Sequence, residues 1–215
     1  MGFSEGLLQA VEPQWRAMLE HPFLRQTADG TLPAGRFETW LRQDYIFVRE
    51  DIGFVGCLIA RAPVELRRPL GEFVVALHSE MELFESMAKE LGVDLSTVEP
   101  SPICHAYNMF LLATVHTRSF AESFTVFYGA EKAYFDSWTY VKRLQNQPSP
   151  YQRFIDHWSS DSFAAWVNWL AQVLDTIATA CGVNELKRME ELFRLTARYE
   201  YLFWDMALKG DQWPV

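Results

Sequence analysis

The sequence predicts an all-α protein of about eight helices. Apolar residues recur at three- and four-residue spacing along most of the chain, as expected for amphipathic helices. No Val-, Ile- or Thr-rich run alternates between apolar and polar residues in the manner of a strand. The chain has 215 residues, of which 49% are hydrophobic. This length fits one domain covering residues 1–215.

The first helix is expected over residues 4–19, where Ser4 is a plausible N-cap and the apolar stripe includes Leu7, Val11 and Trp15. This helix should end near Pro22. A short turn region follows and runs to Gly30.

Two long helices should come next. Residues 34–60 place Phe37, Trp40 and other apolar side chains on one arc, and a third helix runs from Pro63 to Leu91. Gly92 occupies the usual position after the end of a helix. A loop is expected over residues 93–102, which carry two prolines.

Five further helices are expected in the second half of the chain. Asn146–Pro150 marks a turn between two of them, Ser160–Ser162 is a cap, and Gly182 ends a helix. The expected helices cover residues 103–116, 120–144, 151–158, 163–181 and 185–209.

Composition excludes several classes of function. The net charge of −9 argues against a nucleic-acid partner, because phosphate binding needs a surplus of Lys and Arg. The N-terminal residues resemble neither a signal peptide nor a membrane span, so we expect no membrane partner and a cytoplasmic location. Cys57, Cys104 and Cys181 are odd in number and widely spaced, which indicates reduced thiols.

Three carboxylates fall on the apolar arcs of different long helices. They are Asp44, Glu131 and Glu200. A single inward acid is most often a hydrogen-bonded structural group, but three favour a shared cavity if their helices face one another. Like charges in such a cavity raise at least one pKa, which provides a proton donor beside an acceptor. Hydrolysis by general acid/base catalysis requires such a donor and acceptor pair.

A metal site is the competing use of such acids. Di-iron bundles place Glu-x-x-His pairs on facing helices, and the histidines of this chain do not complete that spacing with an inward acid. We therefore expect no metal and no other cofactor. A haem needs one axial histidine only, and spacing does not exclude it.

Seven short motifs, in matching order and spacing, resemble the TenA/thiaminase II family. The likeness spans nearly the whole chain, and the last motif is long and specific. The motifs are His21-Pro-Phe, Gly30-Thr-Leu-Pro, Gln43-Asp-Tyr45, Glu80-Met-Glu-Leu, Ala106-Tyr107, Ser119-Phe-Ala-Glu122 and Arg198-Tyr-Glu-Tyr-Leu-Phe-Trp-Asp-Met206. The resemblance implies a haem-oxygenase-like helical bundle, a homo-oligomer (dimer or tetramer), and salvage of the thiamin pyrimidine by hydrolysis.

The resemblance also implies roles for individual residues. Asp44 matches the acid that holds the pyrimidine, Tyr107 an aromatic side chain at the ring, and Glu200 the catalytic glutamate. Ala130 stands where a nucleophilic cysteine would be. Phe47 and Trp158 replace tyrosines near the pocket. The chain therefore looks more like the branch of the family that lacks the cysteine.

Without a thiolate, water must attack directly and an acid must protonate the leaving amine. Glu131 follows the vacated position and faces inward, so it is a candidate for this acid or base. A salt bridge to a neighbouring helix is an equally good explanation of Glu131.

The resulting prediction is an aminopyrimidine hydrolase without a cysteine nucleophile. Its substrate would be 4-amino-5-aminomethyl-2-methylpyrimidine, its N-formyl derivative, or both, and its product hydroxymethylpyrimidine. Two alternatives stay open. One is a non-catalytic pyrimidine-binding or regulatory protein, since a fold alone does not establish turnover. The other is a di-iron or haem-associated oxidase of the same fold.

Overall fold

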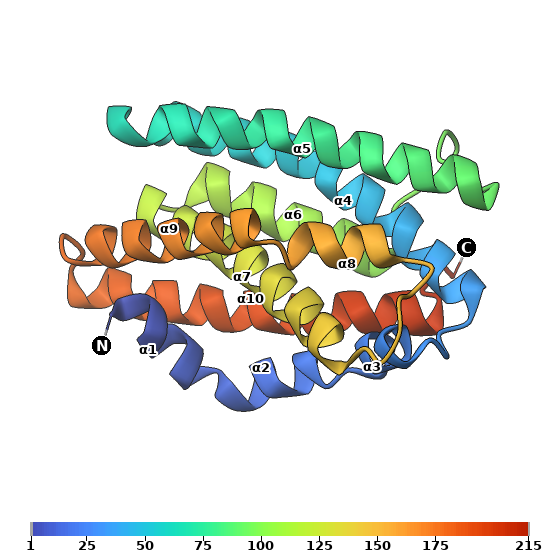
Figure 1. Ribbon diagram of the computed structural model, residues 1–215. Helices are drawn as coiled ribbons and strands as arrows, with labels where there is room; N and C mark the ends of the chain where they lie inside the picture. Colours follow the sequence, from blue (N-terminus) through green and yellow to red (C-terminus); the bar gives the residue numbers. More distant parts are fainter. Residues whose placement is uncertain (1, 215) are drawn as a thin grey trace. The chain divides into compact units, whose positions relative to one another are not determined.

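The computed structural model describes residues 2–214, and within this range the chain forms helices and no strands (Figure 1). The all-α prediction is confirmed. Ten helices are found in this range: α1 Phe3–Ala10, α2 Glu12–Leu19, α3 Pro22–Asp29, α4 Ala34–Arg61, α5 Val64–Leu91, α6 Pro102–Thr117, α7 Phe120–Leu144, α8 Gln152–Trp158, α9 Asp161–Ala178 and α10 Val183–Lys209. No helix among these residues is long and apolar enough to cross a membrane.

The helix predicted over residues 4–19 is in fact two helices. Val11 separates α1 from α2, with φ −118° and ψ 14°. Pro13 causes the break, because it lacks an N–H and its ring would collide with the carbonyl four residues earlier. Proline is tolerated in the first turn of a helix, which is where Pro13 lies in α2.

The turn region predicted between Pro22 and Gly30 is also helical, as α3. His21 caps this helix, since its Nδ1 accepts a hydrogen bond from the Phe23 amide at 3.1 Å. Gly30 ends it in the left-handed conformation, with φ 77°. Histidine is not a usual N-cap residue, so Pro22 at the first position is the standard start signal of α3.

The remaining boundaries lie close to the predicted ones, with one larger difference. α9 ends at Ala178, not at residue 181, because the amides of Thr179, Ala180 and Cys181 bond to carbonyls three residues earlier. This tighter pattern commonly finishes a helix. At α5 the expected cap is present, with Gly92 at φ 69°.

The chain divides into two compact units. The first comprises the residues up to Pro33 together with Phe124–Asp205, and the second comprises Ala34–Ser123 together with the residues from Met206 onward. α7 and α10 each contribute residues to both units. The single-domain organisation of residues 1–215 stays a prediction.

In the second unit, α4 packs along α5 and α6 (Figure 1). Phe37, Trp40 and Phe84 are fully buried there, and the rings of Trp40 and Phe84 lie 5.8 Å apart. Burial of each such side chain stabilises the fold by about 2–3 kcal/mol. This core fixes the inward face of α4.

In the first unit, α7 and α10 approach each other closely. A Cβ on Gly129 would lie 2.9 Å from Thr196 Cγ2 and 3.3 Å from Phe193 Cδ2, so a glycine is needed at this crossing. Phe193 also stacks on Trp15 of α2, with ring centroids 5.5 Å apart. These contacts fix the inward face of α10.

Candidate active site

Within the second unit, Asp44 lies one helical turn from an aromatic pair. Its side chain is 0% exposed. Phe47 follows on the same face of α4, and its ring centroid is 4.9 Å from that of Tyr107 on α6. Phe47 and Tyr107 are also buried. The structure thus groups three of the predicted site residues, a carboxylate beside two aromatic rings.

Cys104 is the thiol nearest to this group. Its Sγ donates a hydrogen bond to the Gln43 carbonyl at 3.4 Å, and Asn108 Nδ2 lies 3.8 Å from the same sulfur. Burial, with the nearby charge of Asp44 as a second cause, raises the pKa of Cys104 to about 12. A protonated thiol is a poor nucleophile, so these surroundings do not favour covalent catalysis by Cys104.

Within the first unit, Glu200 lies on the α7–α10 interface. Gly129 contacts Thr196 at one end of this stretch, and the rings of Tyr134 and Trp204 lie 5.5 Å apart at the other. The two helices therefore run in the same direction here. Ala130 on α7 and Glu200 on α10 both lie between these two contacts. Glu200 is 0% exposed. The prediction that Glu200 faces inward is confirmed.

The side chain of Glu131, on α7, points toward α9. Its Oε2 accepts a hydrogen bond from Trp166 Nε1 of α9 at 2.9 Å. The side chain is only partly buried. This bond ties one oxygen of the carboxylate to α9 and so orients the side chain.

Trp158 belongs to an aromatic cluster in the first unit. Its ring stacks on Trp138 at 5.4 Å and on Phe154 at 5.5 Å, and meets Tyr134 edge-on at 5.5 Å. Trp158 is 2% exposed. The cluster continues to Trp204, one turn beyond Glu200 on α10.

Among residues 2–214, no group of three or more His, Cys, Asp or Glu side chains is close enough together to hold a metal ion.

Two residues of the site region were not identified from the sequence. Gly129 is an isolated glycine inside a helix, which is a signal of close packing. Trp166 carries no such signal, since its bond to Glu131 spans 35 positions of the sequence.

The geometry can be compared with known proteins. The family model described as TENA/THI-4/PQQC matches residues 8–210. The chain belongs to this family. The chain is also 28% identical over 222 residues to a protein of Halalkalibacterium halodurans named aminopyrimidine aminohydrolase, covering 99% of this chain and 98% of that protein.

Solved structures agree with the assignment to the TENA/THI-4/PQQC family. A TenA homologue from Pyrococcus furiosus is 38% identical, with a TM-score of 0.93 over 95% of this chain and 99% of that one. A protein from Shewanella denitrificans described as having a heme oxygenase-like fold is 14% identical, with a TM-score of 0.75 over 95% of this chain and 91% of that one. The haem-oxygenase-like fold expected from the resemblance is confirmed.

Proposed function

We propose that this protein is an aminopyrimidine hydrolase of thiamin salvage that works without a cysteine nucleophile. The observation that carries the proposal is Glu200, a fully buried carboxylate on the stretch of α10 that packs against the stretch of α7 carrying Ala130. The full-length likeness to a protein named aminopyrimidine aminohydrolase supports the same activity.

Asp44, Phe47 and Tyr107 bind the substrate in this proposal. A buried carboxylate accepts hydrogen bonds from the amino group and a protonated ring nitrogen of the aminopyrimidine. The two aromatic rings offer flat apolar surface to the heterocycle. Trp158 and Ala130 are further substrate-binding candidates, on the strength of the family resemblance.

The carboxylates of Glu200 and Glu131 move the protons. Water attacks the exocyclic methylene carbon of 4-amino-5-aminomethyl-2-methylpyrimidine, a C–O bond forms, and the C–N bond breaks. One carboxyl group gives a proton to the departing amine, and one carboxylate takes a proton from the attacking water, so that ammonia and the hydroxymethyl product are released. For the N-formyl substrate, the leaving group is formamide.

Three compounds test the activity: the aminomethyl pyrimidine, its N-formyl derivative and thiamin. Release of hydroxymethylpyrimidine is followed by chromatography for the wild type and for Asp44→Asn. We expect turnover of at least one aminopyrimidine by the wild type and a rise in KM for Asp44→Asn. If all three compounds bind but no product forms, the proposed enzymatic activity is wrong, and a pyrimidine-binding protein is favoured instead.

A separate pair of variants tests Glu131. Glu131→Gln keeps an oxygen that accepts the Trp166 N–H but removes the acid, so we expect a loss of kcat of about 100-fold or more. Glu190→Gln, a surface glutamate paired with Arg194, is the control. Full activity of Glu131→Gln would reduce Glu131 to a structural hydrogen-bond acceptor.

The proposal includes a cytoplasmic homo-oligomer, either a dimer or a tetramer. Leu195, Tyr201 and Leu202 on α10 are 36–38% exposed, and Tyr201 and Leu202 line an apolar groove of about 340 Å³ with Ala17 of α2. Light scattering coupled to gel filtration gives the mass directly. A monomer at micromolar concentration would contradict the oligomer.

A further inference from the structure

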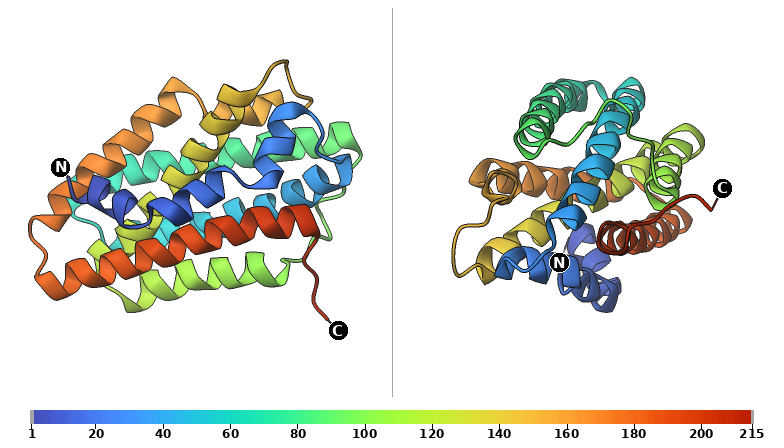
Figure 2. Two further views of the ribbon diagram at one scale, coloured as in Figure 1. Left: turned by 90° about the horizontal axis from the view of Figure 1, so that it is seen from below. Right: turned by 90° about the vertical axis from the view of Figure 1, so that its right-hand side faces the viewer.

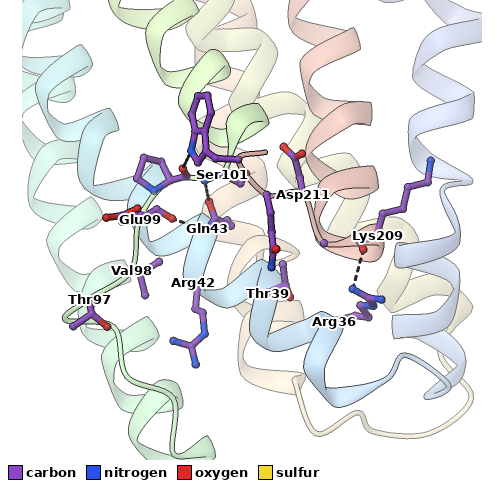
Figure 3. A pocket seen from close by; sticks show the side chains of 14 residues that line it. Arg36, Thr39, Arg42, Gln43, Thr97, Val98, Glu99, Ser101, Lys209 and Asp211 are labelled. Atoms are coloured by element: carbon purple, nitrogen blue, oxygen red, sulfur yellow. Dashed lines mark hydrogen bonds between the residues drawn. The ribbon is translucent and has the colours of Figure 1, made fainter. Parts of the chain in front are cut away.

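A cavity of about 730 Å³ lies within the second unit (Figure 3). Its walls are the first turns of α4, the loop before α6 and the residues that follow α10. Asp44, Phe47 and Tyr107 do not line it. The volume is in the range of small-molecule sites.

The loop wall of this cavity is held in place by Gln43. Its buried amide donates from Nε2 to the Glu99 carbonyl at 3.1 Å and accepts from the Ser101 amide at 2.8 Å. Both bonds are inside the unit, so the loop keeps its position when the cavity is empty.

The C-terminal wall is equally anchored. After α10 the chain continues as an extended segment (Figure 2). Asp211 Oδ2 accepts a hydrogen bond from the Ile103 amide at 2.9 Å, and Trp213 Nε1 donates to the Pro100 carbonyl at 2.9 Å. The cavity is therefore preformed, which lowers the entropic cost of binding.

Two guanidinium groups on α4 supply its charge. Arg36 donates to the Lys209 carbonyl at 3.0 Å and Arg42 to the Asp94 carbonyl. Among residues 2–214, neither arginine forms a salt bridge with a carboxylate. Each guanidinium has five N–H donors, so each retains donors for a ligand. Figure 3 shows both arginines extending from the same helix, with Thr39 on the stretch between them.

Cations outnumber the acids in the lining, where Arg36, Arg42 and Lys209 face Glu99 and Asp211. Asp94 lies outside the lining and also interacts electrostatically with Arg42. Trp213 is 50% exposed and lines the cavity beside Pro100. A flat apolar surface thus adjoins two positive charges, in a protein whose net charge is −9.

We propose that this cavity binds a small phosphate monoester with a flat organic group. A phosphate monoester carries close to two negative charges at neutral pH, which matches the two guanidinium groups, and arginine binds its oxygens bidentately. The organic group lies against the indole of Trp213. The site is distinct from the residues assigned to hydrolysis.

Isothermal titration calorimetry with phenyl phosphate tests the site directly. We expect saturable binding by the wild type, at least tenfold weaker binding by Arg36→Gln and Arg42→Gln, and partial recovery by Arg42→Lys. Arg68→Gln removes an exposed arginine on α5 paired with Glu72, and it should bind as the wild type does. Equal affinity across all these variants, or no binding by the wild type, would overturn the proposal.

Further probes identify what the site recognises. Trp213→Ala should weaken the binding of phenyl phosphate at least fivefold. The affinity for inorganic phosphate should stay unchanged, because only phenyl phosphate has a ring that stacks on the indole. Benzoate, with one negative charge, should bind more weakly than phenyl phosphate. Binding of benzylamine as tight as that of phenyl phosphate would show that the charge argument is wrong.

Discussion

Cys104 illustrates how the surroundings of a residue decide its chemistry. Among the described residues it is the only fully buried cysteine, and it lies beside Asp44 at the α4–α6 interface. Removal from water and a neighbouring negative charge both oppose formation of the thiolate. A cysteine close to a site is therefore not evidence of covalent catalysis.

Cys104→Ser tests this interpretation. The hydroxyl can still donate to the Gln43 carbonyl, so we expect turnover within about twofold of the wild type, because a neutral thiol contributes no nucleophile. Initial rates with the aminomethyl pyrimidine give the answer. A loss above 100-fold in a variant with an unchanged circular dichroism spectrum would make Cys104 a catalytic residue.

Asp51 is a second buried acid on α4. Burial, followed by the charge of Glu80 on α5, raises its pKa from 3.8 to about 7. Between these two values the folded state binds more protons than the unfolded state, so stability is lost as the pH rises through about 7. The neutral acid is the form that the fold accommodates.

Asp51→Asn imitates that neutral form at every pH. Relative to the wild type, we expect the variant to gain roughly 2–3 kcal/mol in unfolding free energy between pH 5 and pH 8. Urea unfolding at the two pH values measures the change. A difference between variant and wild type that is the same at both would show that Asp51 does not titrate in this range.

At the scale of helices, the sequence predicted α4 to α7 to within one or two residues. Long apolar stripes and strong end signals, such as Gly92, make this possible. α3 was missed because eight residues give too short a pattern and because its cap, His21, acts through a ring nitrogen. The break at Val11 was also missed, although Pro13 signals it, because proline disrupts a helix that continues through it.

Gly129 sets the distance between α7 and α10. Gly129→Ala should lower the unfolding free energy by about 1–3 kcal/mol, because the new methyl group collides with Thr196 and Phe193. Urea unfolding measures the loss.

The matched control is Gly53→Ala on the exposed face of α4, where nothing lies within 4 Å of the new Cβ. It should stabilise the protein by about 0.5–1 kcal/mol. Equal effects of the two substitutions would mean that the α7–α10 crossing is not tight.

At the scale of the whole molecule, the candidate site could be predicted only in part. Helical periodicity identified Asp44 and Glu200 as inward acids, and both are fully buried. Periodicity gives the direction of a side chain on its own helix but not the partner that it meets. For this reason the bond from Trp166 to Glu131 and the thiol beside Asp44 became visible only in the structure.

The single-domain prediction has its own test. α7 and α10 supply residues to both compact units, so neither unit can unfold without breaking these helices. We expect one cooperative urea transition, with coincident curves from far-ultraviolet circular dichroism and tryptophan fluorescence. Six of the eight tryptophans lie in the first unit, which makes fluorescence report mainly on it. Two separated transitions would mean two domains.

The central claim is that Glu200 moves protons in a hydrolysis without a cysteine. The most direct measurement is single-turnover conversion of the aminomethyl pyrimidine by the wild type and by Glu200→Gln, with substrate affinity measured in parallel. Our account predicts that Glu200→Gln loses at least about 1,000-fold in rate, since general acid/base catalysis is removed, while affinity changes by less than about tenfold. Hydrolysis by Glu200→Gln at close to the wild-type rate would contradict it.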